Sequence, residues 1–224
     1  MDERDSNKKD VIDCFKNEPK QQPCFNLKQL TELNVEKTYI FKGRKSENKL
    51  VDSFPIFKEA LNKLGFSSDT YLVIKQFIGE TVSNAIKSYG SKQLLDQYGS
   101  FEAILVNDNS KHIIDDAITE GYDETVIKFC WLVMENRLRL KIINNTPLND
   151  YMEERIRKSL YRDKELTPEE LMNIGCEGTL FDTKASGMGI GLWMVKKILE
   201  KVERGKVYFL RKDDETEFVI EIQK

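Results

Sequence analysis

The sequence predicts an α+β fold, a two-layer sandwich in which a largely antiparallel mixed sheet is covered by helices on one face. Two pairs of strand-like runs predict the sheet: residues 126–133 with 137–144, and residues 206–210 with 217–222. A short polar turn joins each pair, as in an antiparallel hairpin. Two stretches with apolar residues at helical spacing, 69–89 and 193–201, predict covering helices.

The composition excludes several classes of protein. Of the 224 residues 40% are apolar, and 35 basic side chains nearly balance 38 acidic ones, so we expect no nucleic-acid-binding surface. The longest apolar run, residues 129–134, is too short to span a bilayer, and the N-terminus lacks the apolar segment of a secretory signal. We therefore expect a cytoplasmic protein without membrane contact.

The cysteines and the single histidine limit which metal sites and reaction mechanisms the chain could have. Cys14, Cys24, Cys130 and Cys176 contain no CxxC pair, which fits unpaired thiols in a reducing compartment and disfavours a zinc site. His112 is the only histidine and lies in a polar stretch without a nucleophile motif. A Ser-His-Asp or Cys-His mechanism therefore has no basis in this chain.

The first 50 residues are predicted to be a polar N-terminal extension, partly disordered. Residues 1–24 are charged and carry two prolines, whereas residues 38–41 suggest an edge strand followed by a basic loop over 42–49. A domain over residues 51–224 follows. It begins with a short helix over residues 54–64 that Gly65 ends.

The long helix expected from Asp69, a possible N-cap, to about Tyr89 carries two stripes. One is apolar, and the other presents Glu80, Asn84 and Lys87 at spacings of three and four. A carboxylate, an amide and an ammonium group therefore project from one side of the helix. A solvated helix face has the same pattern.

Two stretches are long and polar. Residues 91–124 exceed a simple connection and are predicted to be a helical or irregular insertion. Residues 149–186 contain two short helical patterns, the second beginning at Thr167-Pro168, and then loosen through Gly175 and Gly178. We expect this second stretch to be mobile, with few side chains that could anchor it.

Gly187, Gly189 and Gly191 open the helix over residues 193–201. Glycines at alternate positions allow close backbone approach, and a helix N-terminus offers amide donors and a partial positive charge to an anion such as a phosphate chain. A plain helix start with tight packing would look the same.

These motifs form an ordered set. Glu80-x-x-x-Asn84-Ala85 lies on a long helix, a strand ends in a polar turn at Asn144, and Phe181-x-Thr183-Lys184 precedes Gly187-x-Gly189-x-Gly191-Leu192. The set resembles the histidine-kinase-like ATPase superfamily of gyrase, Hsp90, MutL and sensor kinases. The C-terminal motifs look most like sensor kinase catalytic domains, and the helix motif is closer to anti-sigma-factor kinases. The resemblance covers roughly residues 50–224 without 91–124, and it implies a Bergerat-type fold that binds ATP and Mg²⁺.

The resemblance implies a role for each matching residue. Asn84 would ligate Mg²⁺, Lys87 would approach the phosphates, and Glu80 would be the catalytic residue beside the γ-phosphate. The backbone of the nucleotide-binding glycines and Leu192 would cradle the triphosphate. Residues 149–186 would be the ATP lid, whose Thr183 and Lys184 contact the γ-phosphate; the alternative for Lys184 is an ordinary solvated lysine.

One motif departs from the family pattern. Most members carry Asp-x-Gly-x-Gly at the adenine end, and the corresponding run here is Asn144 to Leu148, with Thr146 and Leu148 at the glycine positions. The Asn144 amide can still accept from the exocyclic amine of adenine, but without charge assistance, so selectivity against GTP should be looser. The alternative is a pocket that no longer binds nucleotide tightly.

Two functions fit these observations. The first is an enzyme that transfers the γ-phosphoryl group of Mg-ATP to a protein partner in a signalling pathway, or hydrolyses it. No histidine precedes Glu80, so the chain is not a complete sensor histidine kinase and the phosphoacceptor would be supplied in trans. The second is a regulatory interaction module with a weak nucleotide switch or none.

Overall fold

The computed structural model describes residues 8–14, 24–42, 45–100, 103, 106–107, 109–146, 148, 150–160, 191–202 and 205–224. Within these residues one six-stranded sheet has the order β1-β2-β3-β4-β6-β5. Its strands are β1 (Lys8–Asp13), β2 (Val35–Lys42), β3 (Val126–Met134), β4 (Arg137–Asn144), β5 (Gly205–Arg211) and β6 (Thr216–Gln223). Only β1 and β2 pair in parallel, so the predicted mixed, largely antiparallel sheet is confirmed.

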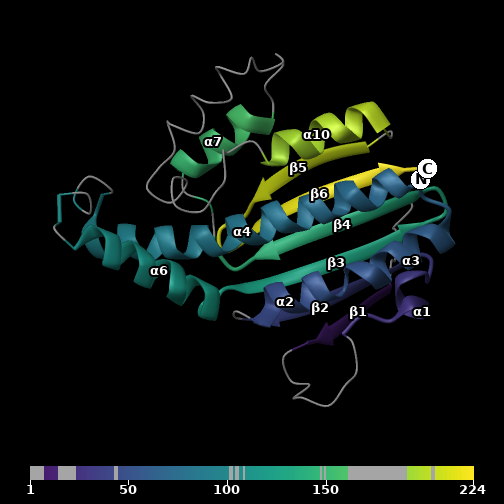
Figure 1. Cartoon of the computed structure of the whole chain (residues 1–224), viewed down its shortest axis with the longest axis horizontal. Coiled ribbons are helices and arrows are strands. Elements are labelled where there is room, and N and C mark those ends of the chain that lie inside the picture. Colours follow the sequence, from purple (N-terminus) through teal and green to yellow (C-terminus); the bar gives the residue numbers. More distant parts are fainter. Residues whose placement is uncertain are drawn as a thin grey trace.

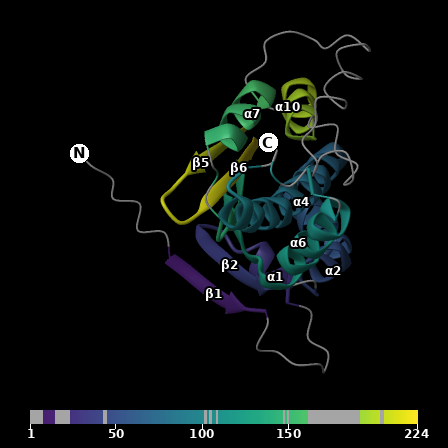
Figure 2. The same ribbon diagram turned by 90° about the vertical axis from the view of Figure 1, so that its left-hand side faces the viewer.

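The described helices form the second layer. They are α1 (Leu27–Leu30), α2 (Lys45–Asp52), α3 (Phe54–Leu64), α4 (Ser68–Tyr98), α6 (Ser110–Glu124), α7 (Asp150–Leu160) and α10 (Gly191–Val202). Figure 2 shows α2, α4 and α6 on one side of the sheet, and Figure 1 shows α4 crossing in front of its strands. The two-layer α+β prediction is therefore confirmed.

The core lies between the layers because alternate strand residues point toward the helices. Tyr39, Phe129 and Trp131 are fully or almost fully buried on this face, and the Trp131 indole donates to the carbonyl oxygen of Leu30 at 2.8 Å. Phe57 of α3 stacks on Trp131 with ring centroids 5.5 Å apart. The other sheet face is mixed: it buries Leu132 and Val219 and carries ion pairs such as Glu36 with Lys141 at 2.7 Å.

The helix α4 is longer than predicted. Its N-cap is Ser67, whose hydroxyl accepts from the Thr70 amide, so Asp69 lies in the first turn instead of capping the helix. It continues past Tyr89 to Tyr98, where Gly99 adopts a positive φ of 77°. Leu94 in this extension is buried where α4 packs against α6. Tertiary packing therefore supports the last turns of α4, and the local sequence pattern does not predict them.

The N-terminal residues differ most from the prediction. Residues 8–13 form the edge strand β1, and β2 lies inside the sheet instead of at its edge. The expected basic loop over 42–49 is largely the helix α2. The expected boundary at residue 50 thus does not coincide with a boundary of the sheet, because long-range strand pairing recruits residues whose local pattern is weak.

Candidate functional site

The polar stripe of α4 lies at the edge of the buried helix face. Glu80 and Asn84, one turn apart, are both half-buried, whereas Ile78 and Val82 are buried in the core. The Gln76 side-chain amide donates to Oε1 of Glu80 at 2.9 Å, one turn earlier. Glu80 is therefore oriented within its own helix, an arrangement that the i, i+4 spacing of Gln76 and Glu80 could have predicted.

The first residue of α10 touches Glu80. A Cβ atom added to Gly191 would lie 1.9 Å from both Cδ and Oε2 of the Glu80 side chain. The backbone at the N-terminus of α10 therefore lies so close to the carboxylate that any residue other than glycine would displace the Glu80 side chain. The structure thus brings together two motifs that are 111 residues apart in the sequence. The partial positive charge of a helix N-terminus favours a carboxylate there, and it would favour a phosphate equally.

The other predicted residues of this region divide into two groups. The Leu192 side chain is only 5% exposed and packs in the core with Val195 and Leu199, so it anchors α10 and leaves only its backbone for a ligand. Thr183, Lys184, Gly187 and Gly189 lie outside the described residues, as does the side chain of Lys87.

The end of β4 forms the second half of the candidate site. Asn144 and Thr146 are each 1% exposed. Among the described residues, neither amide atom of Asn144 nor the hydroxyl of Thr146 has a hydrogen-bond partner. A buried polar group without a partner costs about 1–3 kcal/mol, so these three atoms at the end of β4 are a place where a ligand could supply the missing partners.

Neighbouring strands hold this turn in place. The Leu148 amide donates to the Thr216 hydroxyl at 3.1 Å, and that hydroxyl donates to the Thr146 carbonyl oxygen at 2.9 Å. On the other side, the Val126 amide donates to the side-chain oxygen of Asn145 at 3.0 Å. The unpartnered atoms therefore belong to a rigid turn. The sequence identified Asn144, but it treated Thr146 only as a filled glycine position, and the role of Thr216 had no local signal.

The two halves lie at the same end of the sheet. Figure 1 shows β4 ending and α10 beginning on the left, on the side toward which α4 extends. The helix α4 packs against α10, β4 and β6 and so joins both halves. The arrangement offers amide and hydroxyl groups for a ligand's polar ring at the β4 turn, and a carboxylate, an amide oxygen and a helix N-terminus along α4.

The helix α7 begins the stretch of residues 149–186 that is expected to be mobile. Arg211 of β5 pairs with Asp150 and, at 2.9 Å, with Glu153, and the Arg157 guanidinium lies 5.1 Å from the ring centroid of Phe209. Hydrogen bonds from Arg211 and Arg157 lower the pKa of the Glu153 carboxyl. The first third of the stretch is thus anchored on β5; the second helical pattern, at Thr167, lies outside the described residues.

The described residues lack a metal-ligand cluster and a membrane-spanning helix. No cluster of three or more His, Cys, Asp or Glu side chains in this part of the chain could hold a metal ion. None of the helices in this part is long and apolar enough to cross a membrane.

Comparison with solved structures shows distant similarity to a histidine kinase domain. The chain is similar to the catalytic domain of the histidine kinase ThkA in a nucleotide-free form, with 15% identity over 84% of this chain and 95% of that domain and a TM-score of 0.36. No family model and no curated protein matches. Because so distant a similarity does not establish a shared function, the function is inferred from the residues of this chain.

Proposed function

We propose that this protein binds Mg-ATP and transfers the γ-phosphoryl group to a partner protein or to water. The observation that carries the proposal is the buried turn after β4, where Asn144 and Thr146 present unpartnered polar atoms at the same end of the sheet as Glu80 and Gly191. This combination suits a ligand that has a polar ring at one end and an anionic chain at the other. A nucleoside triphosphate has this form.

The β4 turn fits a nucleobase. The Oδ1 atom of Asn144 can accept from an exocyclic amine, while its Nδ2 group and the Thr146 hydroxyl can donate to ring nitrogens. A neutral amide offers both a donor and an acceptor, unlike the carboxylate typical of the family it resembles. We therefore expect a purine to bind here with looser discrimination between adenine and guanine.

The phosphate end fits α4 and α10. Asn84 would supply one oxygen ligand to Mg²⁺, and the phosphates and water would supply the others, because Mg²⁺ in nucleotide sites usually has few protein ligands. Lys87, Thr183, Lys184, Gly187 and Gly189 belong to this proposal as further phosphate contacts. The bound metal neutralises charge that develops on the phosphates during transfer.

Glu80 is the proposed catalytic residue. Its carboxylate lies beside the N-terminus of α10, where a terminal phosphate would approach, and Gln76 holds one of its oxygens. From this position it would orient a water molecule or an acceptor hydroxyl and take up its proton, a contribution of about 10²–10⁴ in rate. His112, on α6, is the only histidine and none precedes Glu80, so we propose that the acceptor belongs to a partner protein.

A second function is a regulatory module in which nucleotide is bound weakly or not at all. The observation that favours it is the filled β4 turn, in which Leu148 occupies a glycine position and is 2% exposed within the core. A buried leucine there leaves less room for a base than glycine would.

Thermal unfolding separates the two functions. Under the first, Mg-ATP at about a hundred times its dissociation constant should stabilise the fold by about 2.7 kcal/mol, and chelation of Mg²⁺ should reduce the effect. Asn144→Ala should abolish the stabilisation, whereas Asn136→Ala, in the exposed turn at the other end of the β3–β4 pair, should retain it. An unchanged melting temperature in millimolar Mg-ATP would refute the enzymatic proposal and favour the regulatory module.

A further inference from the structure

Two cysteines lie at the β1–β2 end of the sheet, away from the candidate nucleotide site. Cys14 follows β1, its amide donates to the Ile40 carbonyl oxygen at 3.0 Å, and its own carbonyl oxygen accepts from the Lys49 ammonium at 2.6 Å. The residue is 1% exposed. The register of β1 on β2 pairs Ile12 with Tyr39, so Cys14 shares the core side of β1 with Ile12.

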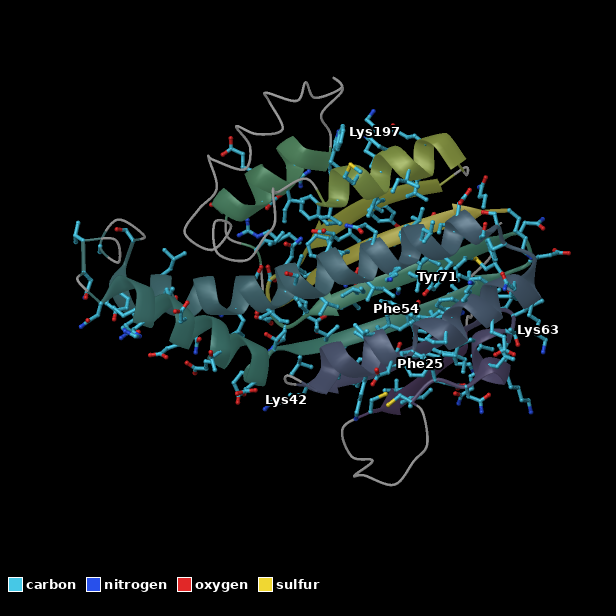
Figure 3. The ribbon with its side chains drawn as sticks, in the orientation of Figure 1. Phe25, Lys42, Phe54, Lys63, Tyr71 and Lys197 are labelled. Carbon is cyan, nitrogen blue, oxygen red and sulfur yellow. The ribbon has the colours of Figure 1, made fainter. Side chains whose placement is uncertain are left out.

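Cys24 approaches the same place from the other side. It directly precedes Phe25, whose ring centroid lies 4.3 Å from that of Tyr39, and Figure 3 shows Phe25 at this end of the molecule. Cys24 is half-buried and packs against the core cluster that contains Cys14. Cys24 is therefore next to a ring neighbour of Tyr39, and Cys14 is two residues from Ile12, the strand partner of Tyr39.

Tyr39 is the buried residue that both cysteines flank. Burial raises the pKa of Tyr39 most, and the nearby thiols of Cys14 and Cys24 raise it further. Its hydroxyl is buried without a hydrogen-bond partner among the described residues. Cys14 and Cys24 therefore lie on either side of Tyr39 at this edge of the core, although nine residues separate them along the chain.

We propose that Cys14 and Cys24 form a reversible dithiol–disulfide pair that a peroxide closes. The two differ in exposure, which sets the order of events: the half-buried Cys24 can meet a small oxidant, and the buried Cys14 is shielded from it. A reactive cysteine beside a resolving cysteine is the usual arrangement of redox-sensing thiols.

The chemistry balances with hydrogen peroxide as the oxidant. The Cys24 thiolate attacks one peroxide oxygen, the O–O bond breaks, and Cys24 becomes a sulfenic acid while hydroxide leaves and is protonated to water. The Cys14 thiolate then attacks the Cys24 sulfur, the S–O bond breaks, and a second water leaves. Two thiols lose two electrons and two protons, and one peroxide becomes two waters.

Closing the bond would fasten the edge strand. In the reduced protein, side-chain ion pairs attach β1 to its surroundings: Lys37 is 2% exposed and pairs with Asp10 and, at 2.6 Å, with Glu32, and Lys9 lies 3.8 Å from Glu36. A disulfide would add a covalent tie between β1 and the segment that leads into α1. Cys130 is a poor competitor because burial raises the pKa of its thiol.

Peptide mapping of the full-length protein tests the pair. The protein is treated with hydrogen peroxide, remaining thiols are alkylated, and trypsin digestion follows without reduction. Cleavage after Lys9, Lys16, Lys20 and Lys28 places the cysteines in peptides 10–16 and 21–28, so their disulfide appears as one linked species. We expect that species in the wild type and in Cys130→Ser and Cys176→Ser. It should be lost in Cys24→Ser and, if Cys14→Ser folds, in that variant too, and dithiothreitol should reverse it.

Stability gives an independent readout. A disulfide that closes a loop of this length should raise the melting temperature of the oxidised wild type by roughly 5–10 °C, and Cys24→Ser should show no oxidation-dependent rise. Linkage of Cys24 to Cys130, to Cys176 or to a second chain would overturn the proposal. So would a Cys24 sulfinic acid accompanied by an alkylated Cys14.

Discussion

The two halves of the candidate site are built in opposite ways. The turn after β4 is buried and held by Thr216 and Asn145, and it leaves the polar atoms of Asn144 and Thr146 without partners. The α4–α10 half is partly exposed, and its Glu80 carboxylate already has Gln76 as a partner. The β4 half therefore has buried polar atoms without partners, whereas the α4–α10 half has a charged side chain that already has one.

This contrast suggests a separate role for each half of the site. Under the proposed function, the buried turn would set which base binds, because each buried polar group left unmatched carries a penalty. A half-exposed carboxylate contributes little to binding an anionic chain and much to aligning a nucleophile. Recognition should therefore depend on the β4 turn, and turnover should depend on α4 and α10.

The largest expected effect comes from Glu80→Ala. Turnover should fall by about 10²–10⁴, because the group that aligns the nucleophile and accepts its proton is lost. Binding of Mg-ATP should change little, because the carboxylate repels phosphates in the ground state. Steady-state phosphate release and calorimetric titration measure the two quantities.

Asn84→Ala is the matched contrast on the same helix. Loss of a Mg²⁺ ligand should weaken Mg-ATP binding itself while affecting ADP without metal less. If Glu80→Ala weakened binding as strongly as Asn84→Ala, the division of labour along α4 would be wrong.

The next effect is a trade between stability and binding at the β4 turn. Asn144→Leu replaces two unpartnered buried atoms with a side chain of similar size, so the ligand-free protein should gain on the order of 1–2 kcal/mol. The same change should remove the stabilisation of about 2.7 kcal/mol expected from saturating Mg-ATP. Urea unfolding with and without nucleotide gives both numbers.

A control for this trade is Asn136→Leu in the exposed β3–β4 turn. It should leave nucleotide stabilisation unchanged and should not stabilise the ligand-free protein. If Asn144→Leu destabilised the ligand-free protein, the Asn144 amide would have a structural role. The proposal that this amide is reserved for a ligand would then be wrong.

Two glycine substitutions test the α4–α10 half of the site. Gly79→Ala on α4 has open space around the new Cβ and should stabilise by about 1 kcal/mol through helix propensity. Gly191→Ala would place its Cβ within 1.9 Å of the Glu80 carboxyl carbon, so that carboxylate must move. We expect lower turnover for Gly191→Ala and normal turnover for Gly79→Ala. Equal turnover would mean that the contact between α10 and Glu80 has no catalytic role.

The smallest effect concerns the anchor of α7. Because the folded-state pKa of Glu153 is lowered, its contribution to stability is present above the ordinary glutamate pKa of 4.5 and is lost as the pH falls through the lowered folded value. Hydrogen exchange of the α7 amides should therefore accelerate in acid. Arg211→Ala should show the faster exchange already at neutral pH, because it removes the first cause of the shift. If exchange in that variant were identical to wild type, the ion pairs of Arg211 would not be what anchors α7.

Prediction from sequence succeeded where local pattern and final packing agree. The helix over residues 54–64 and both hairpins were predicted to within a few residues, because helical period, alternation and turn residues are local signals. It failed for β1 and α2, and it ended α4 too early. Those elements depend on partners distant in the chain: β1 on the side of β2, and the last turns of α4 on α6.

Residue type and spacing alone identify the chemical groups available: an amide at the end of a buried strand, a carboxylate one turn before Asn84, and glycines at a helix start. These follow from residue type and spacing, which any fold of the chain must carry. Only the tertiary structure decided that Gly191 lies against Glu80 and that Asn144 and Thr146 are buried without partners. Such facts arise from packing between segments, because burial converts an ordinary polar side chain into one that requires a partner.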